Sequence, residues 1–256
     1  MIAGIMQPYF FPYFGYFDHI SRCDAWVVLD ITQYTPQSWM TRNRILHPVR
    51  GRQYINCDVH GSEKMTPSSV RLCDRAKTRN KTLGKLAHYK KHAPWHAQVI
   101  RIVEHAFDAA RSDSLTDIDV SGLSAVCAYL SIPFSPVIAS EAAFALPEIT
   151  HPGQWSLEIC SLLGATTYLN TPGGRALFRP EEFAGRGIRL GFTGIPNFAY
   201  DCKPYVYEPH LSILDVLMWN SPEEVRAQCG REEVEYVRPG KNAGACRSLA
   251  MDVRQE

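Results

Sequence analysis

Short, continuous runs of apolar residues recur along the chain, separated by polar turns or by segments of helical period. IAGIM (2–6) and AWVVLD (25–30) are two such runs, and the segment between them is long enough for one helix. Continuous apolar runs are typical of parallel strands covered on both faces, and parallel neighbours need a crossover of about this length. The start of the chain therefore predicts a βαβ unit.

The same alternation returns in the second half of the chain. WSLEICSLLGA reads as a helix and leads into TTYLN (166–170), and PEEFAGRG reads as a second helix and leads into the apolar run at 188–192. Strands that alternate with helices are typical of α/β proteins. We therefore expect an α/β fold with a mostly parallel, Rossmann-like sheet.

The middle of the chain follows a different pattern. QYINCDV (53–59) reads as a further strand, and SWMTRNRILHPVRG before it reads as a loop with an edge segment. Apolar residues at helical spacing then predict helices over about 80–132. We expect a single α/β domain over residues 1–240 with this helical middle insertion, followed by an accessory C-terminal tail at 241–256.

Composition narrows the classes of partner. Lys and Arg number 27 against 26 Asp and Glu, a net charge of +1, so charge gives no reason to expect a nucleic-acid partner. The sequence lacks a run of ~20 apolar residues and a signal-peptide pattern. The eight cysteines are scattered without a C-x-x-C pair, which favours free thiols over disulfides or zinc. We expect a cytoplasmic protein with no membrane span and no metal site.

Aromatic residues crowd the turn after the first predicted strand, QPYFFPYFGYF. In α/β sheets, ligands bind where such turns leave the carboxyl ends of strands. The phenylalanines are expected in the core, whereas each buried tyrosine hydroxyl needs a hydrogen-bond partner. Gln7, Tyr9, Tyr13 and Tyr16 are therefore the expected ligand contacts in this turn.

One tetrad of this turn, Tyr13-Phe14-Gly15-Tyr16, bears on the fold and the chemistry. It occupies the place where nucleotidyltransferases of the HIGH type carry their signature, between a strand and a helix. The glycine and the setting are similar, but both histidines of that signature are missing. A HIGH-type variant of the Rossmann-like fold is therefore an alternative, without its principal phosphate-stabilising groups.

Polar residues near two other predicted strands are also candidates. Asp30 ends the second apolar run, a position that suits catalysis or a loop cap equally well. Arg42, Asn43 and Arg44 in SWMTRNRI could form a forked clamp for a carboxylate or phosphate. The alternative for this stretch is an exposed basic run.

The second half of the chain adds two smaller groups of candidates. In NTPGGRALF, the backbone amides of Gly173 and Gly174 could cradle an anion, and Arg175 could pair with it. Ser212 and Asp215 lie at the start of a late helix, where Ser212 could equally be the N-cap.

Three stretches together resemble the WbqC-like proteins: IMQPYFFPYFGYFDHI with the following VVLD, SWMTRNRI, and the run from ICSLLGATTYLN to YEPHLSILDVL. The resemblance implies a cytosolic enzyme that makes or decorates an activated sugar or small metabolite. The family is associated with gene clusters for O-antigen and for natural products. Acyl or aminoacyl transfer to an amine is the reaction proposed for it.

The resemblance also carries over functional positions. These are Gln7, Pro8, Tyr9, Pro12, Gly15, Tyr16, Asp30, Arg42, Asn43, Arg44, Tyr168, Gly173, Ser212 and Asp215. The chain departs from the family pattern at ITQY after Asp30 and at NTPGG, where SGPGG is usual. Asn170 in place of a serine weakens any role for a hydroxyl nucleophile there.

The leading hypothesis is a transferase that forms an amide or ester on a small polar acceptor, such as an amino sugar or a natural-product intermediate. Arg42 and Arg44 would bind an anionic group, Asp30 or His60 would act as general base, and the paired glycines would stabilise developing negative charge. No cofactor is certain, and an acyl thioester and a nucleotide are the candidates.

Two alternatives remain open from the sequence. One is a nucleotidyltransferase-like enzyme that uses ATP or CTP. The other is a non-catalytic subunit that binds an acyl or peptidyl carrier protein through the basic segment 85–91. A small-molecule substrate is the expected partner in both enzyme hypotheses.

Overall fold

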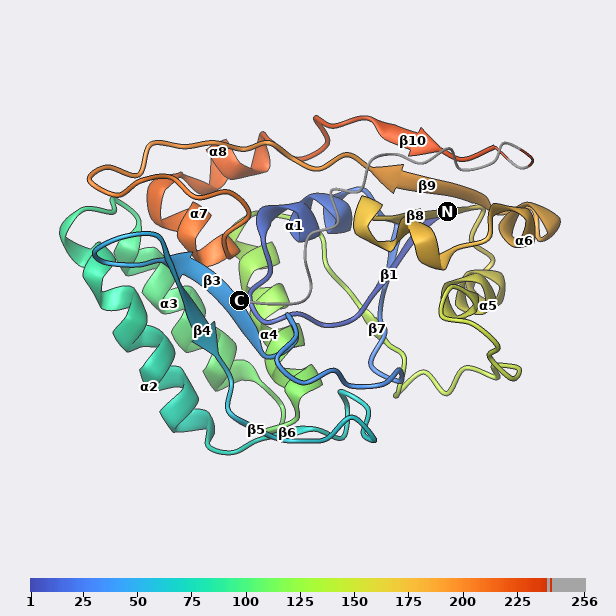
Figure 1. Ribbon diagram of the computed structural model, residues 1–256, viewed down its shortest axis with the longest axis horizontal. Coiled ribbons are helices and arrows are strands. Elements are labelled where there is room, and N and C mark those ends of the chain that lie inside the picture. The colour runs from blue at the N-terminus through green and yellow to red at the C-terminus, as the bar shows by residue number, and fades with distance from the viewer. Residues whose placement is uncertain (239, 241–256) are drawn as a thin grey trace.

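A six-stranded sheet forms the centre of the protein (Figure 1). The computed structural model describes residues 1–238 and 240. The strands, in their order across the sheet, are β10 (Val234–Tyr236), β9 (Arg189–Thr193), β8 (Thr167–Asn170), β1 (Ile2–Met6), β2 (Ala25–Val28) and β7 (Val137–Ile138). All neighbours are parallel except β10, which is antiparallel to β9. The predicted mostly parallel α/β sheet is confirmed.

Helices cover both faces of the sheet (Figure 1). One core packs β2 residues against α1 (Phe14–Ser21), α3 (His96–Ala109), α4 (Leu115–Tyr129) and α7 (Ile213–Trp219). A second core packs the opposite face against α5 (Gln154–Leu163) and α6 (Pro180–Gly185). Because both faces are buried, the central strands need continuous apolar sequence, which is why the sequence identifies them.

Gly4 in the middle of β1 illustrates how closely the elements approach. A Cβ atom at this position would lie 2.7 Å from the ring of Trp26 on the neighbouring strand. The indole therefore lies directly against the β1 backbone. A side chain at position 4 would clash with it, so the position requires glycine. This contact packs β1 closely against β2.

The segment between β2 and β7 holds two small sheets and the helical section. β3 (Arg42–Leu46) and β4 (Arg52–Asn56) form an antiparallel hairpin, and β5 (Val59–His60) pairs with β6 (Arg71–Leu72). α2 (Arg75–Leu86) and the 3₁₀ helix η1 (Ala87–Lys91) precede α3 and α4.

Two predictions for this segment were wrong in detail. The expected strand at 53–59 is divided between β4 and β5, and the expected loop and edge segment at 38–51 contains β3. β3 alternates buried and half-buried residues, as a two-stranded hairpin with one packed face does. A search for continuous apolar runs does not detect such a strand.

The last part of the described chain runs along the top of Figure 1. The 3₁₀ helix η2 (Pro172–Leu177) follows β8, and α8 (Pro222–Arg226) begins with a capping box between Ser221 and Glu224. The expected accessory tail at 241–256 lies outside the described residues. Within the described residues, every helix is too short or too polar to cross a bilayer.

Candidate functional site

The phenylalanines of the aromatic turn anchor it in the core, as predicted. Phe10, Phe11, Phe14 and Phe17 are at most 5% exposed. The turn backbone is held as well: the Phe10 N–H donates to the Trp39 carbonyl at 2.9 Å, and the Ser212 hydroxyl donates to the Phe11 carbonyl at 2.7 Å. Packing and hydrogen bonding therefore fix the position at which α1 begins.

The tyrosines of the same turn divide into two groups. Tyr16 is 1% exposed and donates to the Gln7 carbonyl at 2.8 Å, so it braces the turn from inside. Tyr9 is half-buried with its ring 5.6 Å from that of Tyr16, and the Gln7 amide donates to Thr32 at 2.9 Å. Tyr13, which is half-buried, lines an open cleft.

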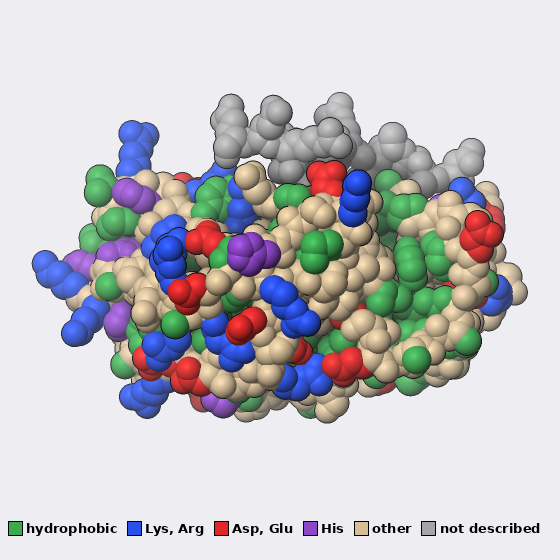
Figure 2. Space-filling view, turned by 90° about the horizontal axis from the view of Figure 1, so that it is seen from below, with side chains coloured by type: hydrophobic (Ala, Val, Ile, Leu, Met, Phe, Trp, Pro, Cys, Tyr) green, Lys and Arg blue, Asp and Glu red, His purple; other side chains and the backbone are tan. Residues whose placement is uncertain are grey.

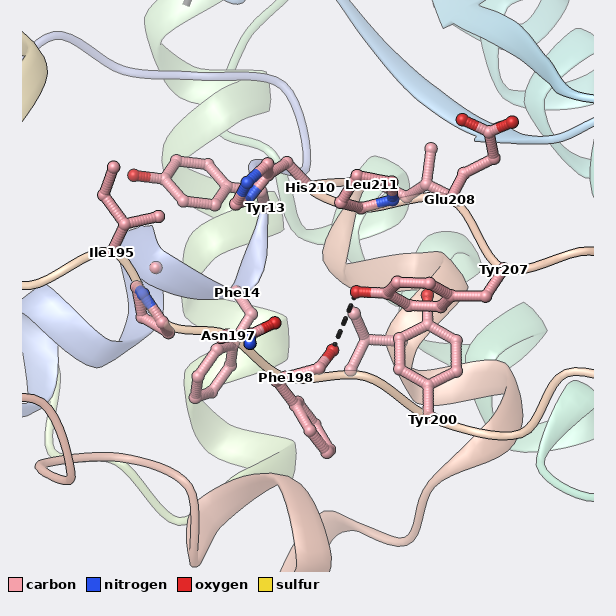
Figure 3. Close-up of a pocket in the computed structure, with 14 residues that line it drawn as sticks. Tyr13, Phe14, Ile195, Asn197, Phe198, Tyr200, Tyr207, Glu208, His210 and Leu211 are labelled. Carbon is pink, nitrogen blue, oxygen red and sulfur yellow. Dashed lines mark hydrogen bonds between the residues drawn. The ribbon is translucent and has the colours of Figure 1, made fainter. Parts of the chain in front are cut away.

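This tyrosine cleft lies between the start of α1 and the loop 194–211, which connects β9 to α7 (Figure 3). It has a volume of about 150 Å³. Its lining residues include Tyr13, Phe14, Gly15, Asn197, Phe198, Tyr200, Tyr207, Glu208 and His210. The Tyr207 hydroxyl donates to the Phe198 carbonyl at 3.1 Å, which ties one end of the loop to the other.

His210 is the residue of the cleft with the most unusual backbone. Its φ angle is +54°, in the left-handed region that costs a non-glycine residue free energy. Its ring lies beside that of Tyr13, with centroids 6.2 Å apart and planes at 86° (Figure 3). Burial, with a smaller effect from the charge of Arg44, lowers the pKa of His210. The imidazole is therefore mainly neutral near pH 7 and able to accept a proton.

Arg44 on β3 is the cation whose charge lowers the pKa of His210. Its guanidinium lies over the Trp39 ring at 5.1 Å, and its Nε is buried with no hydrogen-bond partner among the described residues. Burial and the charge of Arg52 lower the pKa of Arg44, whereas Glu208 raises it. The guanidinium stays charged because its ordinary pKa is above 12, so it can receive an anion.

The other candidates on β3 and α7 have structural partners. Asn43 donates to the Phe10 carbonyl at 3.2 Å and accepts from the Arg44 N–H at 2.8 Å. Arg42 lies over the Tyr54 ring at 4.7 Å. Ser212 is the N-cap of α7, accepting from the Leu214 N–H. The bonds from Asn43 to the Phe10 carbonyl and from Ser212 to the Phe11 carbonyl hold β3 and α7 against the aromatic turn.

Asp215 is a fully buried junction beneath the cleft. Its carboxylate accepts from the Tyr89 hydroxyl at 2.5 Å, the Leu46 N–H at 3.0 Å and the Tyr200 hydroxyl at 3.0 Å. Burial raises the pKa of Asp215, and these hydrogen bonds oppose that rise. Through Tyr200, the junction joins the loop 194–211 to β3 and η1.

Asp30 and His60 lie away from the tyrosine cleft. Asp30 is 0% exposed, and its two oxygens accept from the backbone N–H and the hydroxyl of Ser140 at 2.9 and 2.6 Å. It lines a second pocket, near the ends of β2 and β7. His60 is exposed on β5, opposite Arg71 on β6. Neither residue lines the cleft that contains Tyr13.

The candidates near β8 form a third location. Tyr168 is 0% exposed and bonded to Ser156 and Asn170 at 3.0 and 2.6 Å, and burial raises its pKa. A Cβ atom on Gly173 would meet open space, and one on Gly174 would lie 3.2 Å from the Asn170 Oδ1.

Arg175 in the same loop already has two partners. It forms an ion pair with Glu235 on β10, with nitrogen–oxygen distances of 3.0 and 2.5 Å, and its guanidinium lies 4.3 Å from the Phe192 ring centroid. An anion at the paired glycines would compete with Glu235 for this side chain.

The sequence missed the cleft residues of the loop 194–211, above all His210. A signal was present, because EPH stands directly before LSILDVL in the C-terminal stretch that resembles the family. Among the described residues, no group of three or more His, Cys, Asp or Glu side chains could hold a metal ion. The seven cysteines described are free thiols.

Comparison with known proteins identifies relatives. The chain is 27% identical over 246 residues to the uncharacterized protein Rv1507c of Mycobacterium tuberculosis, a match that covers 92% of this chain and 97% of that protein. No solved structure matches it. The sequence model of the WbqC-like protein family matches residues 7–227, which include the aromatic turn, β3 and the cleft loop. The protein belongs to the WbqC-like family.

Proposed function

We propose that this protein is a biosynthetic transferase that forms an amide or ester on a small polar acceptor, and that the reaction takes place in the tyrosine cleft. One observation carries the proposal: a neutral, half-buried histidine, His210, is held in a left-handed backbone beside Tyr13 at the start of α1. Backbone strain of this kind persists where the surrounding structure enforces it, and it is frequent at active sites.

The cleft offers the groups that acyl transfer needs. The first N–H groups of a helix have no partner within the helix, so those of Phe14 and Gly15 can donate to a carbonyl oxygen that becomes negative. Arg44 lies outside the cleft lining but its charge acts on His210, so it can bind an anionic part of the donor or acceptor at the edge of the cleft. His210 can take a proton from the attacking group.

The step balances with these residues alone. The nitrogen or oxygen of the acceptor forms a bond to the donor carbonyl carbon and gives its proton to His210. The bond between that carbon and the leaving group then breaks, and the leaving group takes the proton from His210. This assignment replaces Asp30 and His60 as the proposed base. Asp30 is buried and hydrogen-bonded to Ser140, so an acceptor cannot reach its carboxylate. His60 is exposed on β5 and does not line the cleft.

The proposal is tested by amide formation between an acyl N-acetylcysteamine thioester and an amino sugar such as glucosamine. His210→Gln should lower the catalysed rate about 100-fold, the usual contribution of a general base. His105→Gln, at an exposed position on α3, is the matched control and should leave the rate unchanged. In the wild type, the rate should fall only as pH drops below the ordinary histidine pKa of ~6.5. A rate unaffected by His210→Gln would overturn the assignment.

A reaction that uses a nucleotide is the second candidate. The strand order β10-β9-β8-β1-β2-β7 favours it, because crossovers go in opposite directions from β1 and make a switch point between β1 and β8. We infer a Rossmann-like fold, with Gln7 and the Gly173–Gly174 loop at that crevice. Stabilisation by ATP or CTP, lost in Gly173→Val and retained in His210→Gln, would favour this reading over acyl-thioester chemistry.

A further inference from the structure

A second, polar pocket lies at the N-terminus of α4, between β6 and the ends of β2 and β7. It has a volume of about 180 Å³, and Ile138 is the one aliphatic residue in its lining. Its side chains are otherwise hydroxyls, carboxylates and arginines. Acidic and basic side chains intermingle on the face of the molecule on which β5 and β6 lie (Figure 2).

Two of the three carboxylates of this polar pocket form ion pairs with one arginine. Arg111 contacts Asp117 at 2.8 Å and Glu141 at 2.5 Å. The Asp30 carboxylate accepts both hydrogen bonds from Ser140. An anion would face three carboxylates against two arginines in this lining, and a cation would have to displace Ser140 from the buried Asp30 or Arg111 from its partners.

Two side chains of the polar pocket, in contrast, can form further hydrogen bonds. Thr116 is 3% exposed and lines the pocket, and its hydroxyl has no hydrogen-bond partner among the described residues. Arg71 uses one guanidinium nitrogen on the Ser112 hydroxyl at 3.0 Å and forms no ion pair with a described residue. A buried hydroxyl without a partner is costly, which indicates that something else bonds to it.

We propose that the polar pocket binds an uncharged, polyhydroxylated ligand such as a sugar ring or a cyclic polyol. Hydroxyl groups both donate and accept, so they can satisfy Thr116 and the serines without adding charge. The fork of Arg71 can donate to two adjacent ligand hydroxyls. This site is separate from the tyrosine cleft and does not depend on the reaction proposed there.

Binding of glucose and of myo-inositol, followed by saturation-transfer NMR and titration, tests the proposal. Thr116→Val keeps the shape of the side chain and removes its hydroxyl, and Arg71→Gln removes the fork. Each should weaken binding about tenfold, the effect of one lost hydrogen bond. Thr35→Val and Arg101→Gln, at exposed positions, are the matched controls and should bind as the wild type does.

Two further measurements separate binding from folding and polyols from ions. Without ligand, Thr116→Val should melt no lower than the wild type, because it removes an unpartnered buried hydroxyl. Tighter binding of inorganic phosphate or glucosamine than of glucose would overturn the proposal, as would no binding of either neutral probe. Activity in the tyrosine cleft should be the same in Thr116→Val and in the wild type, so failure of one proposal leaves the other standing.

Discussion

Two helices, α7 and α4, each bury an aspartate. The carboxylate on α7 accepts several hydrogen bonds, whereas the carboxylate on α4 accepts none from the described residues. Asp215 on α7 is 0% exposed and accepts hydrogen bonds from β3, η1 and the loop 194–211. Asp119 on α4 is 1% exposed, and neither of its oxygens has a partner among the described residues. The same residue type therefore serves as a structural junction in one region and as an uncompensated polar group in the other.

The difference shows how each pocket is built. The tyrosine cleft lies above a hydrogen-bonded network, which holds Tyr200 in the wall of the cleft. The polar pocket lies one helical turn from Asp119, through Thr116, and both side chains are buried without partners. Satisfied hydrogen bonds therefore underlie the tyrosine cleft, whereas buried polar groups without partners lie at the polar pocket.

Removing the junction should have the largest effect. Asp215→Ala leaves the Tyr89 and Tyr200 hydroxyls without their acceptor, and the Leu46 N–H keeps only the Tyr89 hydroxyl oxygen, at 2.9 Å. Each unsatisfied buried donor costs about 1 to 3 kcal/mol, so we expect unfolding free energy in urea to drop by about 3 to 5 kcal/mol. Asp201→Ala, in an exposed part of the loop 194–211, is the control and should change it little. A drop below about 1 kcal/mol would contradict the role of Asp215 as a junction.

The unpartnered aspartate should have a smaller effect that depends on pH. Burial raises the pKa of Asp119 well above its usual value, so the folded state retains a proton that the unfolded chain releases above pH ~3.9. Its contribution to stability is complete below that pH and is lost as pH rises through the native pKa. Asp119→Asn does not lose it, so the variant should gain stability relative to the wild type as pH rises from 4 to 8.

Urea unfolding at a series of pH values measures this gain. Asp108→Asn changes an exposed carboxylate on α3 and should show no comparable trend. A stability difference between Asp119→Asn and the wild type that stays constant with pH would mean that the Asp119 carboxylate is ionised in the folded state. The two buried aspartates would then not differ in the way their surroundings indicate.

Sequence patterns predicted the part of the fold in which both faces of a strand are buried. The runs at 2–6, 25–30 and 166–170 became β1, β2 and β8, because burial on two sides demands continuous apolar sequence. β3 and β10 were not predicted, because they are not buried on both faces and lack a continuous apolar sequence. Both carry charged side chains: Arg44 on β3 lies over the Trp39 ring, and Glu235 on β10 pairs with Arg175, which is 60 residues away in the sequence.

The sequence indicated which types of residue form the candidate site, but it did not show which of them lie together in the fold. Tyr13 and Arg44 could be singled out because their chemistry is visible in local sequence. His210 was missed although EPH precedes LSILDVL in the sequence, because its grouping with Tyr13 depends on a backbone angle and on a ring from the other end of the chain. The burial of Asp30 depends in the same way on Ser140, 110 residues further along the chain.

The smallest expected effect concerns a charged group outside both regions. Arg175 pairs with Glu235, whose side chain is 70% exposed, and lies over the Phe192 ring. Exposed ion pairs and exposed cation–π contacts each contribute at most about 1 kcal/mol, so Arg175→Ala should lower unfolding free energy by about 1 kcal/mol or less. Added salt should reduce the loss, since screening weakens the pair in the wild type. Glu235→Gln is the matched variant, because it removes the ion pair and retains the ring contact. A loss as large as that of Asp215→Ala would show that exposed polar groups also act as junctions in this fold, and the contrast between α7 and α4 would then not depend on burial.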